Sequence, residues 1–366
     1  MLLWKDDDFP MITERKEVHS VSINAGIIGC GGISDFHCRG YEKAGAKIVH
    51  VADVDEAKVK VRAERYACAW SGDYRELLRD PRVECVSICL PNHLHREAAE
   101  AAIAAGKHVL CEKTMTSNLP DAKALVSVVE AGDRIFQVAY MKRFVPAMRQ
   151  AKELIPRLGN PLSGIVRVYH PFPKGNWDFV GGDNWLLNKE KGGAGVVVHS
   201  GSHMLDAMRY LCGDPINVEA KCRVRKGLDY YATAYFRMEA GFTMFFEAGW
   251  LDLPNLGIRN NGLDERIEIT GDKGRLEIFT MWWTRPDIEV PLVRFYSAED
   301  GETREIYSPI TNCFDEEVIA FVTSVKEGKQ GKPDVYDGYM AQAMIDAIYR
   351  SDEESCRVPI ERLCPK

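Results

Sequence analysis

The chain has 366 residues, of which 46% are hydrophobic and 28% are charged. A single core rarely grows to this length, so two domains are expected, and the composition is that of a globular protein rather than a disordered one. The formal charge of −7 offers no general attraction to nucleic acid or anionic lipid, and we expect neither as a partner.

The first residues, MLLWKDDDFP, place three aspartates where a secretory signal would need an apolar stretch. No run approaches the roughly 20 apolar residues of a membrane span. The 11 cysteines are dispersed and mostly lie in apolar runs such as VECVSICL, without a CxxC pair or zinc-type spacing. We therefore expect a cytoplasmic protein with reduced thiols and no metal.

Residues 1–20 are polar and lack periodicity, so we expect an N-terminal arm. From there to residue 142, short β-branched runs alternate with amphipathic ones, which is typical of a doubly wound parallel sheet, the Rossmann arrangement. The expected strands are 22–29, 46–54, 83–91, 107–113 and 134–140. The expected helices are 55–67, 73–80, 95–106 and 118–132.

Residues 143–366 have longer strands, more aromatic residues and more turn residues, which predicts a second α/β domain with a mainly antiparallel sheet. The expected strands are 164–172, 216–225, 229–238, 241–250 and 266–280. The expected helices are 146–159, 203–213, 314–328 and 336–351.

The segment GIIGCGGIS lies between the first expected strand and the first expected helix, the proper context for a dinucleotide fingerprint. Gly29 permits a tight turn, and Gly31, followed by Gly32, lets the backbone approach a pyrophosphate. The helix that begins near Ile33 offers free N–H groups and a partial positive charge. These residues predict a dinucleotide site.

Asp53 ends the second expected strand, about 20 residues after the glycines. Its carboxylate can accept hydrogen bonds from both ribose hydroxyls and would repel a 2′-phosphate, so NAD is expected rather than NADP. The alternative is that Asp53 or Asp55 only caps the next helix.

The segments CLPNHLH and LCEKTM both stand at C-terminal ends of expected parallel strands, where ligands of such sheets bind. We expect Leu90, Asn92, His95, Glu112 and Lys113 to line the cofactor site. A lysine beside a nicotinamide can hydrogen-bond a substrate hydroxyl, and the nearby positive charge would lower its pKa. The alternative for Lys113 is a solvated lysine at a strand end.

The segment GGAGVVVHSGSHMLDAMRYL carries His199 and His203, which a spacing of four places on one helical face. The pair could bind zinc, but no third ligand accompanies it. A histidine is a natural general base for a hydroxyl proton. A buried core histidine is the alternative, and it suits His199 better than His203.

The segment PFPKGNWDFVGGDNWLL carries Trp177, Asp178 and Trp185 on an expected loop. Aromatic residues beside polar groups suit a sugar ring, whose faces are apolar and whose edges are polar. A loop held against the domain by its tryptophans is an equally open alternative. Arg143, at the expected domain junction, is a further candidate for substrate binding.

These motifs together resemble the Gfo/Idh/MocA oxidoreductases over nearly the whole chain from about Val21, including the closing CFDEEVIAFVTSVKEG…AIYRS. The resemblance implies an N-terminal Rossmann domain and a C-terminal domain whose open sheet usually forms the subunit interface, in dimers, tetramers or larger assemblies. It places the catalytic lysine at Lys113 and the histidine at His203. Two positions depart from the family: Thr114 replaces a proline, and His199 replaces the usual aspartate.

The resemblance implies NAD-dependent oxidation of a secondary ring hydroxyl of a sugar, glycoside or cyclitol, with C3 of a glucoside-like pyranose as one expectation. An NAD-assisted glycosidase is an alternative, because some relatives of that kind carry a histidine near the position of His199. A non-catalytic NAD-binding regulator is another alternative, against which the retained Lys113 and His203 argue.

Overall fold

The computed structural model describes residues 22–172, 180, 185–192, 195–257, 262–280, 292–307 and 311–363. The expected N-terminal arm, Trp177 and Asp178 lie outside the described residues.

The first sheet has six parallel strands in the order β3-β2-β1-β4-β5-β6. Its strands are β1 Asn24–Ile28, β2 Lys47–Ala52, β3 Ala69–Ser71, β4 Cys85–Ile88, β5 His108–Cys111 and β6 Phe136–Val138. The helices between them are α1 Gly32–Lys43, α2 Glu56–Tyr66, α3 Tyr74–Arg79, α4 His95–Ala104 and α5 Leu119–Ala131. The strand order reverses between β1 and β4, which is where an open sheet of this kind forms its ligand crevice.

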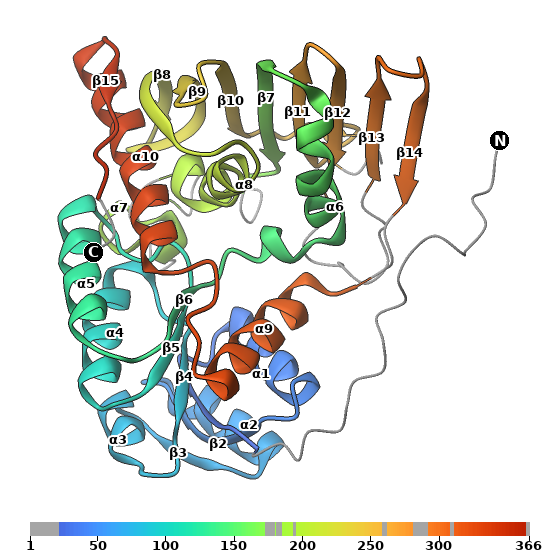
Figure 1. The fold of residues 1–366 in the computed structure, drawn as a ribbon. Helices are drawn as coiled ribbons and strands as arrows, with labels where there is room; N and C mark the ends of the chain where they lie inside the picture. The colour runs from blue at the N-terminus through green and yellow to red at the C-terminus, as the bar shows by residue number, and fades with distance from the viewer. Residues whose placement is uncertain are drawn as a thin grey trace.

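The second sheet has nine strands in the order β14-β13-β12-β11-β7-β10-β9-β8-β15, antiparallel except for the pair β7 and β10. Its strands are β7 Pro161–His170, β8 Pro215–Arg225, β9 Leu228–Met238, β10 Thr243–Trp250, β11 Asp264–Gly271, β12 Gly274–Phe279, β13 Leu292–Ser297, β14 Thr303–Tyr307 and β15 Val358–Pro359. Helices α6 Pro146–Leu154, α8 Ser202–Cys212 and α10 Val335–Glu354 pack on one face (Figure 1). The expected α/β fold class is therefore confirmed.

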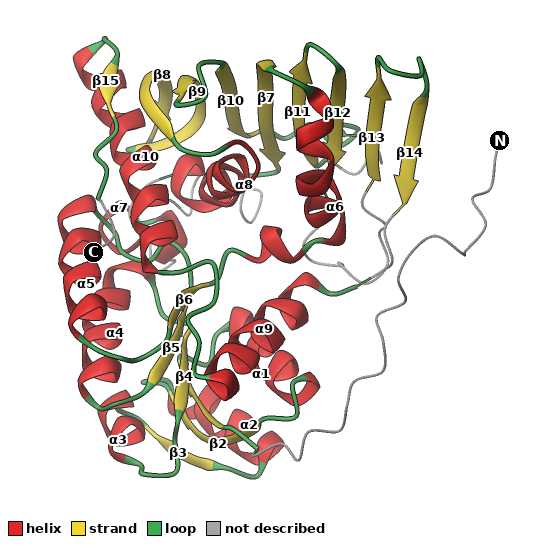
Figure 2. Cartoon of the chain, viewed as in Figure 1, coloured by secondary structure: helices red, strands yellow, loops and turns green. Residues whose placement is uncertain are grey.

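The structure departs from the expected elements in three places. The single strand expected over 266–280 is a hairpin of β11 and β12, which turns at Asp272 and Lys273. The short β3 and the pair β13 and β14 were not expected. β3 has only three residues, and the sequence of β14, TREIY, shows no regular alternation of polar and apolar side chains. Figure 2 shows the two sheets in separate parts of the molecule, each with helices packed against it.

Helix α9 (Cys313–Glu327) returns from the second sheet to the first half of the chain and lies beside α1 (Figure 1). Val318, Phe321 and Val322 of α9 belong to the same buried cluster as β1 and β2. A Cβ atom added to Gly40 of α1 would lie 2.5 Å from Val318 Cβ, so the glycine permits this close helix contact. The division into domains at residue 142 stays a prediction, since the C-terminal part of the chain contributes to both cores.

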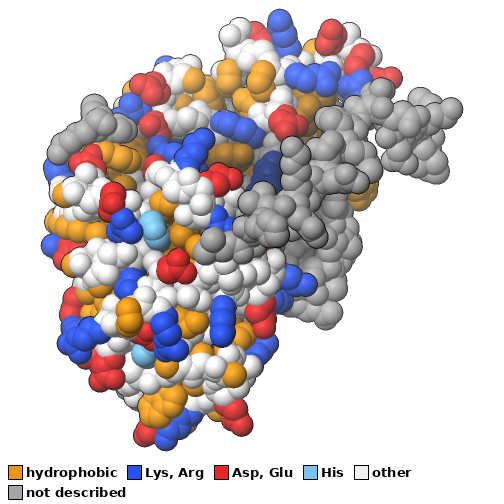
Figure 3. All heavy atoms as spheres, turned by 60° about the horizontal axis from the view of Figure 1, so that its bottom comes forward, with side chains coloured by type: hydrophobic (Ala, Val, Ile, Leu, Met, Phe, Trp, Pro, Cys, Tyr) orange, Lys and Arg blue, Asp and Glu red, His pale blue; other side chains and the backbone are white. Residues whose placement is uncertain are grey.

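The exposed side chains on the face in Figure 3 are of mixed sign, with basic and acidic groups interspersed over it. Interspersed charges give no broad field of one sign to steer a polyanion.

Glu317 on α9 gives a test of how stability depends on pH. Its side chain is buried, and Oε1 has no hydrogen-bond partner among the described residues. Burial, with Glu112 and Asp206 nearby, raises the pKa of Glu317 well above its usual value of 4.5. The folded state therefore retains a proton that the unfolded state releases, and stability falls as pH rises between the two pKa values, with a slope approaching about 1.4 kcal/mol per pH unit.

We expect Glu317→Gln to be more stable than the wild type at pH 8, with a difference that shrinks toward pH 5. Urea unfolding followed by circular dichroism at both pH values measures it. Glu327→Gln, an exposed change on the same helix, is the matched control. A stabilisation that is the same at both pH values would contradict this explanation.

Candidate functional site

A cavity of about 1330 Å³ lies between the two sheets, at the carboxyl ends of β1, β2, β4 and β5. The structure brings most of the sequence-predicted site residues to its wall. These are Gly29, Gly31, Gly32, Ile33, Asp53, Leu90, Asn92, Glu112, Lys113, Trp185, His199 and His203.

The glycine loop leaves room for a dinucleotide. Gly29 has φ +95°, and a Cβ atom there would lie 2.4 Å from the Cys89 carbonyl oxygen, so only glycine fits. A Cβ atom at Gly31 or Gly32 would meet no protein atom within 4 Å. This open space adjoins the N-terminus of α1, whose free N–H groups suit a pyrophosphate.

Asp53 faces the cavity while its neighbour Asp55 caps α2. The Asp53 carboxylate accepts hydrogen bonds from the backbone N–H of Cys30 at 2.6 Å and of Asp55 at 2.8 Å. Asp55 accepts from the backbone N–H groups of Ala57 and Lys58. Asp55 is therefore the residue that caps the helix, and the carboxylate of Asp53 is held at the position where the adenosine ribose lies in folds of this kind.

Lys113 stands at the C-terminal end of β5, and its Nζ donates to the carbonyl oxygen of His199 at 3.0 Å. Burial lowers the pKa of Lys113, and the nearby Glu112 opposes that shift. The Lys113–Thr114 peptide bond is cis. A lysine whose pKa is lowered in this way can exchange a proton with a substrate oxygen more readily than a solvated one.

Glu112 is held in place by His37 and Ser87, which were not predicted as site residues from the sequence. Its Oε1 contacts His37 Nε2 at 2.9 Å, and its Oε2 accepts from the backbone N–H of Lys113 at 3.1 Å. His37 Nδ1 contacts Ser87 Oγ at 2.9 Å. Burial raises the pKa of Glu112, but the hydrogen bond from His37 and the charges of His37 and Lys113 outweigh it, and the pKa lies below its usual value. Glu112 is therefore a buried carboxylate beside the lysine.

His199 lies in a π-helical turn, Val197–Gly201, that leads directly into α8, where His203 is the second residue. Such turns occur often at functional sites, because they redirect side chains within a helix. His203 Nδ1 is buried without a hydrogen-bond partner among the described residues. Burial, and the positive charges of Lys113 and Lys142, lower the pKa of His203 well below its usual value. His203 is therefore a neutral imidazole, which can accept a proton.

An aromatic wall, made of Trp185, His199 and Trp250, lines this part of the cavity, and Phe172 packs against Trp250. The ring of His199 stacks on Trp250 with a centroid distance of 6.0 Å and an angle of 21°. Trp185 meets His199 edge-on at 6.0 Å, and Phe172 meets Trp250 edge-on at 5.2 Å. Trp250 ends β10 and was not predicted as a site residue, because a tryptophan in a buried strand gives no signal of its own.

A polar wall, made of Lys142, His170, Ser200 and Glu265, also lines the cavity. Glu265 accepts from Lys142 Nζ and contacts His170 Nε2 at 2.8 Å. Ser200 Oγ contacts His170 Nδ1 at 3.0 Å. These residues come from four separate segments, so no spacing in the sequence could reveal them.

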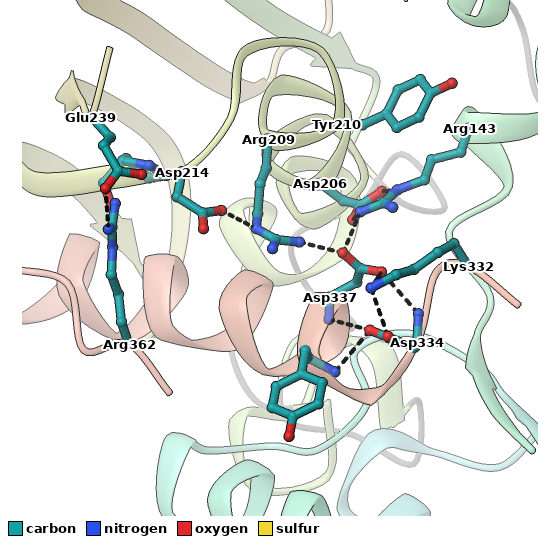
Figure 4. Close-up of polar contacts among 12 residues, drawn as sticks. Arg143, Asp206, Arg209, Tyr210, Asp214, Glu239, Lys332, Asp334, Asp337 and Arg362 are labelled. Carbon is teal, nitrogen blue, oxygen red and sulfur yellow. Dashed lines mark hydrogen bonds and ion pairs between the residues drawn. The ribbon is translucent and has the colours of Figure 1, made fainter. Parts of the chain in front are cut away.

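Arg143 does not reach the cavity, contrary to its expected role in substrate binding. Its guanidinium donates to Asp206 at 2.8 and 2.6 Å and to Asp337 at 3.0 Å (Figure 4). Arg209 also donates to Asp337. Asp206 lies one turn after His203 on α8, so this buried network ties the histidine-bearing helix to the start of α10. The guanidinium is occupied by carboxylates of the protein itself.

His95 does not line the cavity either, although it was expected to contact the cofactor. It is buried at the start of α4, behind the segments that carry Leu90 and Thr114.

The described part of the chain contains no group of three or more His, Cys, Asp or Glu side chains that could hold a metal ion. No helix among the described residues is long and apolar enough to cross a membrane.

Comparisons with known proteins cover both halves of the chain. Residues 23–140 match the family described as "Oxidoreductase family, NAD-binding Rossmann fold", and residues 152–360 match its "C-terminal alpha/beta domain". D-xylose 1-dehydrogenase (NADP(+)) 2 of Haloferax volcanii is 28% identical, over 85% of this chain and 91% of that protein. Myo-inositol 2-dehydrogenase of Thermotoga maritima is 25% identical, over 92% and 98%.

Among solved structures, levoglucosan dehydrogenase in complex with NADH and levoglucosan superposes with a TM-score of 0.82 at 24% identity, covering 93% of this chain and 100% of that one.

Proposed function

The chain belongs to the Gfo/Idh/MocA family of NAD-binding oxidoreductases, and from that premise we propose that it reversibly oxidises a secondary ring hydroxyl of a sugar, glycoside or cyclitol to a ketone. The observation that carries the proposal is that one cavity holds the glycine loop, Asp53, Lys113 and His203. The named relatives act on xylose and myo-inositol, which supports this substrate class.

NAD, when bound, supplies the hydride acceptor. Gly29, Gly31 and the N-terminus of α1 would hold its pyrophosphate, and Asp53 its adenosine ribose. His203, as a neutral imidazole, takes the proton of the reacting hydroxyl. Lys113 donates a hydrogen bond to the same oxygen, which gains negative charge as the proton leaves. The proton removed in the reaction is held at His203 until solvent takes it.

The two walls of the cavity support a carbohydrate ring as the substrate. The aromatic wall offers flat apolar surface to a ring face, and the polar wall offers donors and acceptors to ring hydroxyls. Within this class we put forward C3 of a glucoside-like pyranose. A bulky group on C1 must point away from the buried Lys113, and C3 and C4 are the hydroxyl-bearing ring carbons farthest from C1.

The test is NADH absorbance when the protein and NAD are mixed with free aldoses, inositols and alkyl or aryl glucosides, followed by NMR of the product. We expect NADH to form with at least one ring compound and a ring ketone to appear, at C3 for a glucoside. Release of the aglycone without NADH would replace this proposal by an NAD-assisted glycosidase. Binding of NAD without any reaction across the panel would favour the regulator.

Cofactor choice gives a second prediction. We expect the wild type to bind NAD more tightly than NADP, and Asp53→Ser to reduce that preference at least about tenfold, since a hydrogen bond to a charged group is lost and the repulsion of a 2′-phosphate disappears. Fluorescence titration with NADH and NADPH measures both affinities. Asp55→Ser, the same change at the residue that caps α2, should leave the preference unchanged. Tighter binding of NADPH by the wild type would refute the role of Asp53.

We also propose that the protein is a cytoplasmic homo-oligomer, a dimer or tetramer, whose subunits meet through the open face of the second sheet. Helices α6, α8 and α10 cover the other face. Tyr235 of β9 and Tyr307 of β14 are 55% and 62% exposed. Light scattering of the purified protein measures the mass, and a monomer would contradict this part.

A further inference from the structure

His95 is the last histidine of PNHLH and is fully buried at the first position of α4. Both of its ring nitrogens face main-chain carbonyl oxygens. Nδ1 lies 2.7 Å from the oxygen of Thr114, and Nε2 lies 2.7 Å from the oxygen of Leu90.

This pair of contacts constrains the protonation of the ring. A carbonyl oxygen only accepts hydrogen bonds, and a neutral imidazole carries a single N–H. The neutral ring can therefore bond one of the two oxygens, and its other nitrogen would direct a lone pair at an oxygen lone pair. Both contacts become hydrogen bonds only when both nitrogens carry a proton.

The two carbonyls belong to the two segments that meet at the reaction site. Thr114 directly follows Lys113, whose Nζ contacts His199. Leu90 lines the cavity after β4, and its side chain lies beside Gly29 of the dinucleotide loop. The imidazole of His95 therefore connects the segment that carries Lys113 to the segment of Leu90, which lines the cavity, and it does so from outside the cavity wall.

We propose that His95 is a positioning residue that acts as a protonation-dependent clamp: the imidazolium holds the Leu90 and Thr114 segments together, and loss of one proton releases one of them. The consequence for turnover rests on the proposed role of Lys113, whereas the consequence for cofactor binding does not.

The ionisable groups around His95 act in opposite directions. Burial lowers the pKa of His95, the two carbonyl hydrogen bonds and the carboxylate of Glu112 raise it, and the ammonium of Lys113 lowers it, with a net shift below the usual value. On its own helix, Arg96 pairs with Glu100 and Asp121, and Glu97 pairs with Arg75. The clamp is therefore closed on the acid side and opens as pH rises through the pKa of His95.

Substitution of His95 by asparagine or by glutamine should keep one of the two hydrogen bonds and remove the other. The side-chain nitrogen of asparagine lies close to the position of Nδ1, and that of glutamine close to Nε2. On the acid side, where the wild type has both bonds, we expect His95→Asn to keep the Thr114 bond, so kcat stays near the wild-type value while the Kd for NADH rises about tenfold. At the same pH we expect His95→Gln to keep the Leu90 bond, so the Kd for NADH stays while kcat falls about tenfold.

The pH profiles of these variants provide the accompanying readout. An amide does not titrate, so the ionisation of His95 should be absent from the pH profile of NADH binding in His95→Asn and from that of kcat in His95→Gln. NADH binding needs no substrate, so this part stands even if the panel of ring compounds gives no turnover. Equal losses of NADH binding and kcat in both variants would overturn the clamp.

The protonation itself is measurable in the wild type. In protein labelled with ¹⁵N-histidine, the His95 signals are those that are missing from His95→Gln. We expect both ring nitrogens to carry protons at the acid end of the pH range in which the enzyme is folded, and one proton to be lost as pH rises. A single N–H at every pH in that range would overturn the proposal.

Discussion

Replacing Lys113 with methionine is expected to lower kcat by about 10²- to 10⁴-fold, the usual contribution of a positioned acid or base. Methionine fills similar space but cannot donate to the reacting oxygen. Stopped-flow single turnover with NAD and a substrate from the panel measures the loss, and fluorescence titration checks that NADH binding is near that of the wild type. Lys123→Met, a change at an exposed lysine paired with Glu361, is the matched control.

The same variant should also shift the pH profile. The charge of Lys113 lowers the pKa of His203, so its removal raises that pKa. A general base with a raised pKa is protonated at a higher pH, and the acid limb of kcat/KM should therefore move toward higher pH. Near-normal turnover in Lys113→Met would contradict the proposed mechanism. An unchanged acid limb of kcat/KM would show that this limb does not report the ionisation of His203.

Replacing Arg143 with methionine is expected to lower the free energy of unfolding by about 3–5 kcal/mol, because it leaves the buried carboxylate of Asp206 without its partner. Asp206 is fully buried, and burial already raises its pKa despite Arg143. Without the guanidinium, Asp206 must either bind a proton or remain an unpaired buried charge. Urea unfolding measures the loss, and Arg223→Met, at an exposed arginine of β8, should stay within about 0.5 kcal/mol of the wild type.

A double variant distinguishes a lost ion pair from lost packing. Arg143→Met combined with Asp206→Leu removes both the charge and its partner, and we expect it to recover a substantial part of the loss. A loss of less than about 1 kcal/mol in the free energy of unfolding of Arg143→Met would contradict the stabilising role of this network. So would a double variant whose loss exceeds the summed losses of the two single variants.

The parts of the fold that could be predicted from the sequence are those with a local signal. The strands of the first sheet are buried runs with a helix after each, and the glycine loop carries its own spacing. Lys113 and Asp53 could be located because both stand at the ends of such strands, where the sheet itself determines what faces a ligand.

The polar wall could not be predicted, because Lys142, His170, Ser200 and Glu265 meet only through the packing of the two sheets. Arg143 illustrates a second difficulty. An arginine at a junction can bind a ligand or pair with buried carboxylates, and only the position of Asp206 and Asp337 decides between them.

The most direct test of the central claim is the transfer of deuterium to the cofactor. The protein is incubated with NAD and a glucoside that carries deuterium at a single ring carbon, and the reduced nicotinamide is examined by NMR. The account predicts deuterium at C4 of the nicotinamide when the label is at C3 of the sugar ring, with none when it is at C2 or C4. Reduced cofactor without deuterium from any ring carbon, or no reduced cofactor with glucosides, aldoses or inositols alike, would contradict the claim that this cleft oxidises a ring hydroxyl.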